Sequence, residues 1–197
     1  MGKKSDLIDP TIPAPSGTYL VFIEKVTNAK TKIKPGKGGG HPMAVFDLQV
    51  IAPNRVETER GPIDPTGRQL KWYMAFTPRN KIPVDQTEKL LNTTLPDDFD
   101  EVGDCILPLA AKRGECFEAA LVSEPFYKTD NGKWNGNPIL GEDGQPIVAG
   151  YRLAFKEPLS AIEPVPQGVT VKPVAGAEKP AATADDTEAS PVDHDAA

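Results

Sequence analysis

Two segments of the chain, residues 43–51 and 68–77, place an apolar side chain at every second position, and this spacing constrains the fold most strongly. Successive side chains of a β-strand point to opposite faces, so both segments predict strands with one face in a core. The predicted core positions are Ala44, Phe46, Leu48, Val50, Leu70, Trp72, Met74 and Phe76. The predicted solvent-facing positions are Asp47, Gln49, Gln69, Lys71, Tyr73 and Thr77.

Three further segments, 17–27, 115–123 and 151–155, are rich in β-branched or aromatic residues and also predict strands. One helix is predicted over 83–95, where apolar residues recur at helical spacing between Pro83 and Pro96. The order is therefore three strands, a helix and two strands. This order predicts an all-β fold with one short helix, a five-stranded OB-fold barrel.

An OB-fold binds its ligand on strands 2 and 3, between the loop that joins strands 1 and 2 and the loop that joins strands 4 and 5. Here the first loop is a lysine-glycine segment, 30–40, in which glycines and Pro35 prevent a helix or a strand. The second loop falls within 128–150. A solvated, flexible hairpin is the alternative interpretation of the lysine-glycine segment, but both loops lie where an OB-fold contacts nucleic acid.

This placement predicts binding of single-stranded DNA, because mobile lysines can contact phosphates and exposed aromatic rings can stack on bases. Tyr73 shares a face with Lys71, whereas Trp72 and Phe76 are assigned to the core. Trp134 follows a tight turn at 130–132 and is expected to be exposed; the alternative is that it closes the end of the barrel. The predicted DNA contacts are Lys25, Lys30, Lys32, Lys34, Lys37, Arg68, Lys71, Tyr73, Tyr127, Lys128, Lys133 and Trp134.

The acidic excess of the chain lies entirely in its last fifth. Residues 1–156 hold 20 basic and 20 acidic residues, whereas 157–197 hold 2 basic and 8 acidic residues and no aromatic residue. We expect an N-terminal arm (1–15), a nucleic-acid-binding domain (16–158) and a disordered acidic tail (159–197). The tail could compete with DNA for the basic groove, could bind replication or recombination proteins, or could be a solubilising linker.

Several classes of function are not favoured by the sequence. Two cysteines, Cys105 and Cys116, do not make a disulfide scaffold, so free thiols in the cytoplasm are expected. No signal peptide and no membrane span are predicted. The acidic run 97–104 lacks the spacing of a calcium loop, and the cysteines and histidines lack zinc spacing. No metal, cofactor or catalytic residue is therefore predicted, and homo-oligomerisation stays open.

The segments 15–23, 41–51 and 67–70, with the lysine-glycine loop between the first two, resemble phage-encoded single-stranded DNA-binding proteins of OB type. Residues 113–119 fit the penultimate-strand region of that family, so the resemblance covers about 15–158. It implies sequence-tolerant binding in phage DNA replication, recombination or repair, without catalysis, in the host cytoplasm. Bacterial proteins of this layout end in an acidic tip closed by phenylalanine, whereas this sequence ends in Asp193-His194-Asp195-Ala-Ala.

Three hypotheses follow for the function. The first is single-stranded DNA binding. The second is an OB-like module without catalytic activity whose loops grip a protein, as in phage assembly. The third is a metal-dependent nuclease that uses the carboxylates of 97–104.

Overall fold

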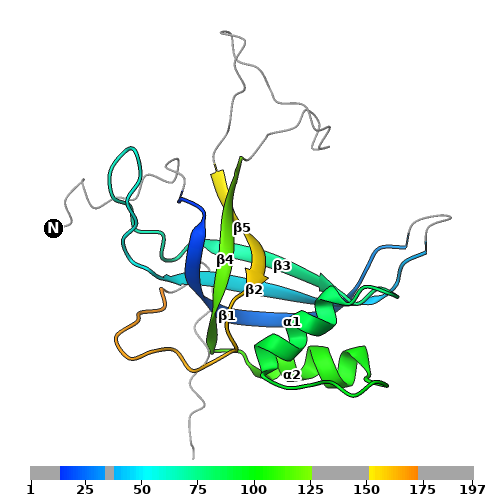
Figure 1. Ribbon diagram of the computed structural model, residues 1–197. Helices are drawn as coiled ribbons and strands as arrows, with labels where there is room; N and C mark the ends of the chain where they lie inside the picture. Colours follow the sequence, from blue (N-terminus) through cyan, green and yellow to red (C-terminus); the bar gives the residue numbers. More distant parts are fainter. Residues whose placement is uncertain (1–13, 34–37, 126–150, 173–197) are drawn as a thin grey trace, which may run out of the picture.

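The computed structural model describes residues 14–33, 38–125 and 151–172 (Figure 1). The strands are β1 (Gly17–Lys30), β2 (Pro42–Ala52), β3 (Gln69–Ala75), β4 (Cys116–Pro125) and β5 (Tyr151–Pro158). Between β3 and β4 lie α1 (Ile82–Leu91), the π-helical turn η2 (Glu101–Ile106) and α2 (Leu107–Ala111). Each predicted strand is confirmed, with ends displaced by a few residues.

The strands form one antiparallel sheet in the order β3-β2-β1-β4-β5. The long strand β1 pairs with β4 through residues 17–22 and with β2 through residues 20–30, and its register with β2 shifts between Ile23 and Lys25. The edge strands β3 and β5 contact each other, and the rings of Trp72 and Phe155 stack with centroids 4.0 Å apart. The sheet therefore curls into a nearly closed barrel, and the predicted OB-fold is confirmed.

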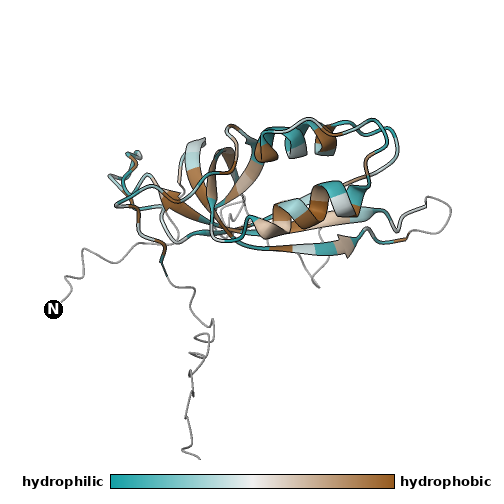
Figure 2. Cartoon of the chain, turned by 90° about the horizontal axis from the view of Figure 1, so that it is seen from below, coloured by the Kyte–Doolittle hydropathy of each residue, from teal (hydrophilic) through white to brown (hydrophobic). Residues whose placement is uncertain are grey.

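The core of the barrel consists of the side chains that the alternation predicts. The alternate residues of β2 from Ala44 to Val50 are fully buried, and the corresponding residues of β3 are nearly so. Phe46, Trp72 and Phe155 form a continuous stack, to which Phe117 adds an edge-to-face contact. In Figure 2 the apolar colour lies mainly in the strands and helices, whereas the connections are mainly hydrophilic. The predictions that Trp72 and Phe76 pack inside are confirmed.

The helical region differs from the predicted single helix. α1 ends at Leu91 because Asn92 adopts a left-handed conformation (φ 50°), so the predicted extension to residue 95 is wrong. The second half of the acidic run 97–104 forms the start of η2, which leads into α2. The Asp100 carboxylate accepts a hydrogen bond from the Gly103 amide at 2.6 Å, which stabilises the start of this turn. Ile106 and Leu109 then bury themselves in the core.

Residues 159–172 pack against the barrel, so the predicted domain boundary at residue 158 is too early. This segment, here called the strap, is antiparallel to the start of β4: Cys116 and Glu163 exchange two backbone hydrogen bonds of 2.8 Å. The Ile162 amide donates to the Leu90 carbonyl, and the Ile162 side chain is buried. Backbone pairing and one apolar anchor therefore hold a segment that lacks aromatic residues.

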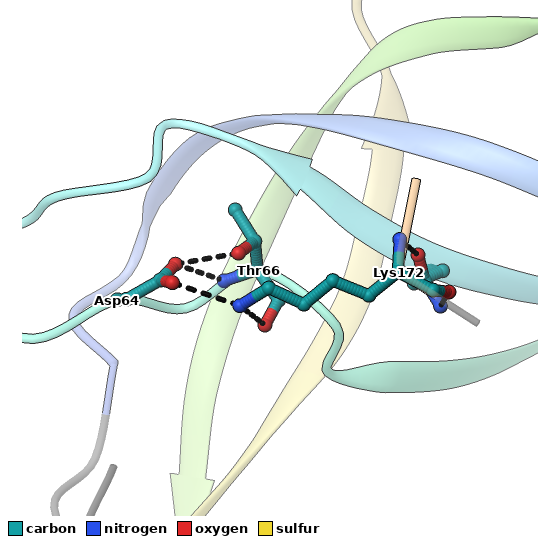
Figure 3. A network of polar contacts seen from close by, with 4 residues as sticks. Asp64, Thr66 and Lys172 are labelled. Atoms are coloured by element: carbon teal, nitrogen blue, oxygen red, sulfur yellow. Dashed lines mark hydrogen bonds and ion pairs between the residues drawn. The ribbon is translucent and has the colours of Figure 1, made fainter. Parts of the chain in front are cut away.

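The strap ends on the outer side of β2. The Gln49 side chain donates to the Lys172 carbonyl (2.8 Å) and accepts from the Lys172 amide (3.1 Å), so it pairs with the backbone as another strand would. The Lys172 ammonium donates to the Asp64 carboxylate (2.8 Å) and to the Thr66 carbonyl (3.2 Å), as Figure 3 shows. Gln49 was predicted to face solvent, but it is 1% exposed beneath the end of the strap.

Asp64 holds its charge in this network. Partial burial by itself would raise its pKa, but hydrogen bonds from Lys172 and Thr66 outweigh this effect and lower the pKa below its ordinary value. The ionised carboxylate is thus the form that fits the end of the strap.

Candidate nucleic-acid interface

The strand register brings Lys25, Asp47 and Lys71 into one row across β1, β2 and β3, on the side opposite the core. A second row, next to the first, contains Val45 and Tyr73 together with Thr27. Adjacent strands are about 4.8 Å apart, so the side chains of each row are neighbours. We call the six residues of these two rows the outer sheet face.

Tyr73 is the prominent aromatic residue of the outer sheet face. Its side chain alternates with those of Trp72 and Met74, which are buried, and Tyr73 is therefore turned outward and 57% exposed. Tyr73 thus offers a flat, exposed surface on the same strand as Lys71.

Lys71 forms an ion pair with Asp47, in which Nζ lies 3.1 Å from Oδ1. The hydrogen bond from Lys71 to Asp47 raises the pKa of Lys71, so the ammonium stays charged at neutral pH. Lys25, on the other side of Asp47, is exposed. The outer sheet face therefore carries two cations about one carboxylate.

The hairpin between β1 and β2 continues beyond the sheet as a two-stranded stalk. The Thr31 amide donates to the His41 carbonyl (2.9 Å), and the Gly40 amide donates to the Thr31 carbonyl (3.0 Å). Gly39 has φ 144°, and a Cβ there would overlap the Lys32 carbonyl oxygen, so only glycine lets the two sides of the stalk approach. The exposed residues Lys30 and Lys32 extend the positive charge along this stalk.

The structure thus brings together some of the predicted contacts and separates others. Lys25, Lys71 and Tyr73 share the outer sheet face, and Lys30 and Lys32 lie on the stalk. Arg68 was predicted to join them. It lies two residues before the buried Leu70, so it falls among the inward-facing positions that continue from β3, and its side chain is half-buried. The predicted contacts outside the described residues are Lys34, Lys37, Tyr127, Lys128, Lys133 and Trp134.

Arg68 lies directly before the first residue of β3, close enough to Tyr19 for an electrostatic interaction. Burial lowers the pKa of Arg68, and Tyr19 opposes this shift; burial also raises the pKa of Tyr19. The Tyr19 hydroxyl donates to the Pro15 carbonyl at 2.6 Å. Arg68 therefore belongs to the packing at the start of β1.

Hydrogen bonds within the fold involve two carboxylates of the acidic run, and burial covers the two cysteines. Asp100 and Asp104 accept backbone hydrogen bonds within η2. Among the residues that the structure describes, no group of three or more His, Cys, Asp or Glu side chains is arranged to hold a metal ion. Cys105 and Cys116 are free and buried; burial above all, with acidic neighbours, raises the pKa of each thiol to about 11.

Across the described ranges, no helix has the length and apolar character needed to cross a bilayer. Comparisons with protein-family models, with curated proteins and with solved structures found no match to this chain.

Proposed function

We propose that this protein binds single-stranded DNA without sequence preference, on the outer sheet face and the adjoining stalk. The observation that carries the proposal is the register of β1, β2 and β3, which puts exposed Tyr73 in the row next to the one that contains Lys25 and Lys71. This is the surface on which OB-folds bind oligonucleotides.

The chemistry of this surface suits a flexible strand whose bases are unpaired. Tyr73 can stack on a base, a contact worth roughly 1–3 kcal/mol that any base can make. Lys71 lies two residues from Tyr73 on the same strand, about 7 Å away, so its ammonium can reach the phosphate next to a stacked base. Both contacts use features common to all nucleotides, which explains why no sequence preference is proposed.

The stalk lengthens the same path. Lys30 and Lys32 continue the positive charge beyond the sheet, and the lysine-glycine segment that they begin contains two more lysines. The resemblance to phage-encoded proteins supports a role in phage DNA replication, recombination or repair. The proposed role is binding and protection of the strand, without catalysis.

A substitution series tests the proposal. Tyr73→Ala should weaken the binding of a fluorescent oligo-dT roughly 5- to 150-fold, because one stacking contact is lost. Tyr73→Phe keeps the ring and should bind within about twofold of the wild type. Lys25→Ala with Lys71→Ala should weaken binding and flatten its salt dependence, whereas Lys89→Ala, on exposed α1, should do neither. Unchanged affinity in Tyr73→Ala would refute the proposed surface.

One observation favours a second candidate, a protein-binding module. Ile33 is 77% exposed on the stalk, which suits a protein partner better than a phosphate backbone. If Ile33→Ser abolished a protein contact while the lysine substitutions left nucleic-acid binding unaltered, the protein-binding module would replace the first proposal.

A further inference from the structure

A groove lies at the base of the stalk, where β3 turns into α1. Its volume is about 450 Å³, within the range of roughly 300–1,000 Å³ in which small-molecule sites fall. The lining comes from the start of β2, the β3–α1 turn, α1, the segment before η2 and the first residue of η2, and it includes Thr77, Arg79, Lys81, Val84, Phe99 and Glu101. No predicted contact includes any of these residues.

The groove continues from the outer sheet face. The outward-facing positions Tyr73 and Ala75 of β3 are followed, two residues beyond the strand, by Thr77, which lines the groove. Four residues of extended chain cover about 13 Å, a distance that a few nucleotides span. The Phe76 amide donates to the Pro42 carbonyl (2.9 Å), so the start of β2 and the end of β3 are joined at the mouth of the groove.

The walls and the rim of the groove differ in character. The walls are apolar and include Val84 and Phe99, whose side chains are half-buried. The charged residues of the lining are the cations Arg79 and Lys81 and the carboxylate Glu101, and Lys81 already pairs with Asp85 at 3.3 Å. Arg79 is exposed, and no ion pair of Arg79 occurs among residues 14–33, 38–125 and 151–172.

The backbone of the β3–α1 turn presents Arg79 in an unusual conformation. Its φ is 67°, in the left-handed region that glycine and asparagine tolerate best. The turn is held by hydrogen bonds from the Asn80 amide to the Thr77 carbonyl (3.1 Å) and from the Ile82 amide to the Asn80 side chain (3.2 Å). Strained residues of this kind concentrate at ligand sites, and here the strained residue is a cation at the rim of a groove.

We propose that this groove takes one nucleotide of the single strand where the strand leaves the outer sheet face, with its base between the apolar walls and its phosphate on Arg79. The inference rests on the proposed function and adds a second contact site to it. It assigns Arg79 as the phosphate-binding residue of this groove.

The backbone of Arg79 allows a clean test, because glycine relieves the left-handed conformation while it removes the charge. Arg79→Gly should retain its melting temperature and bind an oligo-dT of about 16 nucleotides 5- to 20-fold more weakly than the wild type. The slope of log K against log salt should fall by about 0.7, as expected when one phosphate contact to a single strand is lost. Arg79→Lys should restore most of the affinity and the slope.

Arg113→Ala, on the exposed turn between α2 and β4, is the matched control and should bind like the wild type. If the wild type and Arg79→Gly bind oligo-dT equally, with the same slope, the groove inference is wrong while the proposed function stands. If the wild type itself does not bind oligo-dT, the proposed function fails, and the inference fails with it.

Discussion

At the scale of single residues, Asp47 works against the proposed function, because it places a negative charge between Lys25 and Lys71. An incoming phosphate must compete with this carboxylate for Lys71. Asp47→Asn should therefore tighten oligo-dT binding by at most about fivefold, because the exposed ion pair that it removes is weak. Fluorescence anisotropy checks this. Weaker binding would show that Asp47 positions Lys71 for the strand rather than opposing it.

Cys105 and Cys116 should be unreactive while the protein is folded. Their pKa values of about 11 mean that almost no thiolate exists at neutral pH, and burial blocks access as well. A thiol reagent should label both cysteines slowly in the native state and rapidly in denaturant. Equal rates in both states would contradict the buried positions.

The raised pKa values of the same thiols imply that the free energy of unfolding falls at alkaline pH. The folded state holds each proton more tightly than the unfolded state does, so the contribution of the thiols to stability is complete below the ordinary pKa of 9.0. It is lost as the pH rises from 9.0 toward about 11. The midpoint of urea unfolding, measured at pH 8 and pH 10.5, should fall; if cysteine-to-serine variants fall equally, the thiols are not the cause.

At the scale of elements, the buried Gln49 side chain helps to hold the end of the strap at Lys172. Gln49→Ala would leave the Lys172 amide and carbonyl without their partner and should cost about 1–3 kcal/mol in the free energy of unfolding. Gln69 is the matched control, because it is exposed in the neighbouring strand and hydrogen-bonds to Glu24 (2.9 Å). Gln69→Ala should cost well under half as much.

Hydrogen exchange locates the effect of these substitutions. In Gln49→Ala the amides near residue 172 should exchange faster, whereas the amides of the barrel core should keep their relative order of protection. Equal destabilisation by Gln49→Ala and Gln69→Ala would contradict the role assigned to Gln49.

The strands and their faces could be predicted from the sequence because the apolar side chains of each buried face occur at every second residue within one short segment. The strap could not, since its contacts are backbone hydrogen bonds to β4 and one apolar anchor, Ile162, in a proline-rich segment. α2 was missed for a related reason: the acidic run before it looks like a loop until Asp100 is seen to cap the turn.

The residues of the candidate site also divide into those that local alternation predicts and those that depend on the tertiary structure. Lys71 and Tyr73 were predictable, because alternation alone puts them on one face. Arg68 lies apart from them, because it shares the inward-facing positions of β3 and is half-buried. The groove at Arg79 could not be predicted, since it depends on a left-handed turn and on the register that brings His41 beside the end of β3.

At the scale of the whole molecule, the strap delivers the C-terminal segment to the border of the outer sheet face. Lys172 is bound to Gln49, one row from Asp47 and Lys71, and residues 173–197 carry six acidic residues and one lysine. Acidic residues tethered through Lys172 should compete with DNA at high effective concentration. A variant in which these six residues are changed to Asn or Gln should bind oligo-dT more tightly at low salt, and this gain in affinity should vanish at high salt. An equal or weaker affinity at low salt would exclude the competition.

The central claim, that the outer sheet face binds single strands, is tested most directly by titrating fluorescent oligo-dT, oligo-rU and duplex DNA with the wild-type protein at about 50 and 200 mM salt. Three or four phosphate contacts predict that oligo-dT binding weakens about 20- to 50-fold between the two salt concentrations. Binding to the duplex should be much weaker than binding to oligo-dT, because paired bases cannot stack on Tyr73. The comparison with oligo-rU establishes whether DNA is preferred. No binding of oligo-dT at the lower salt concentration would contradict the account.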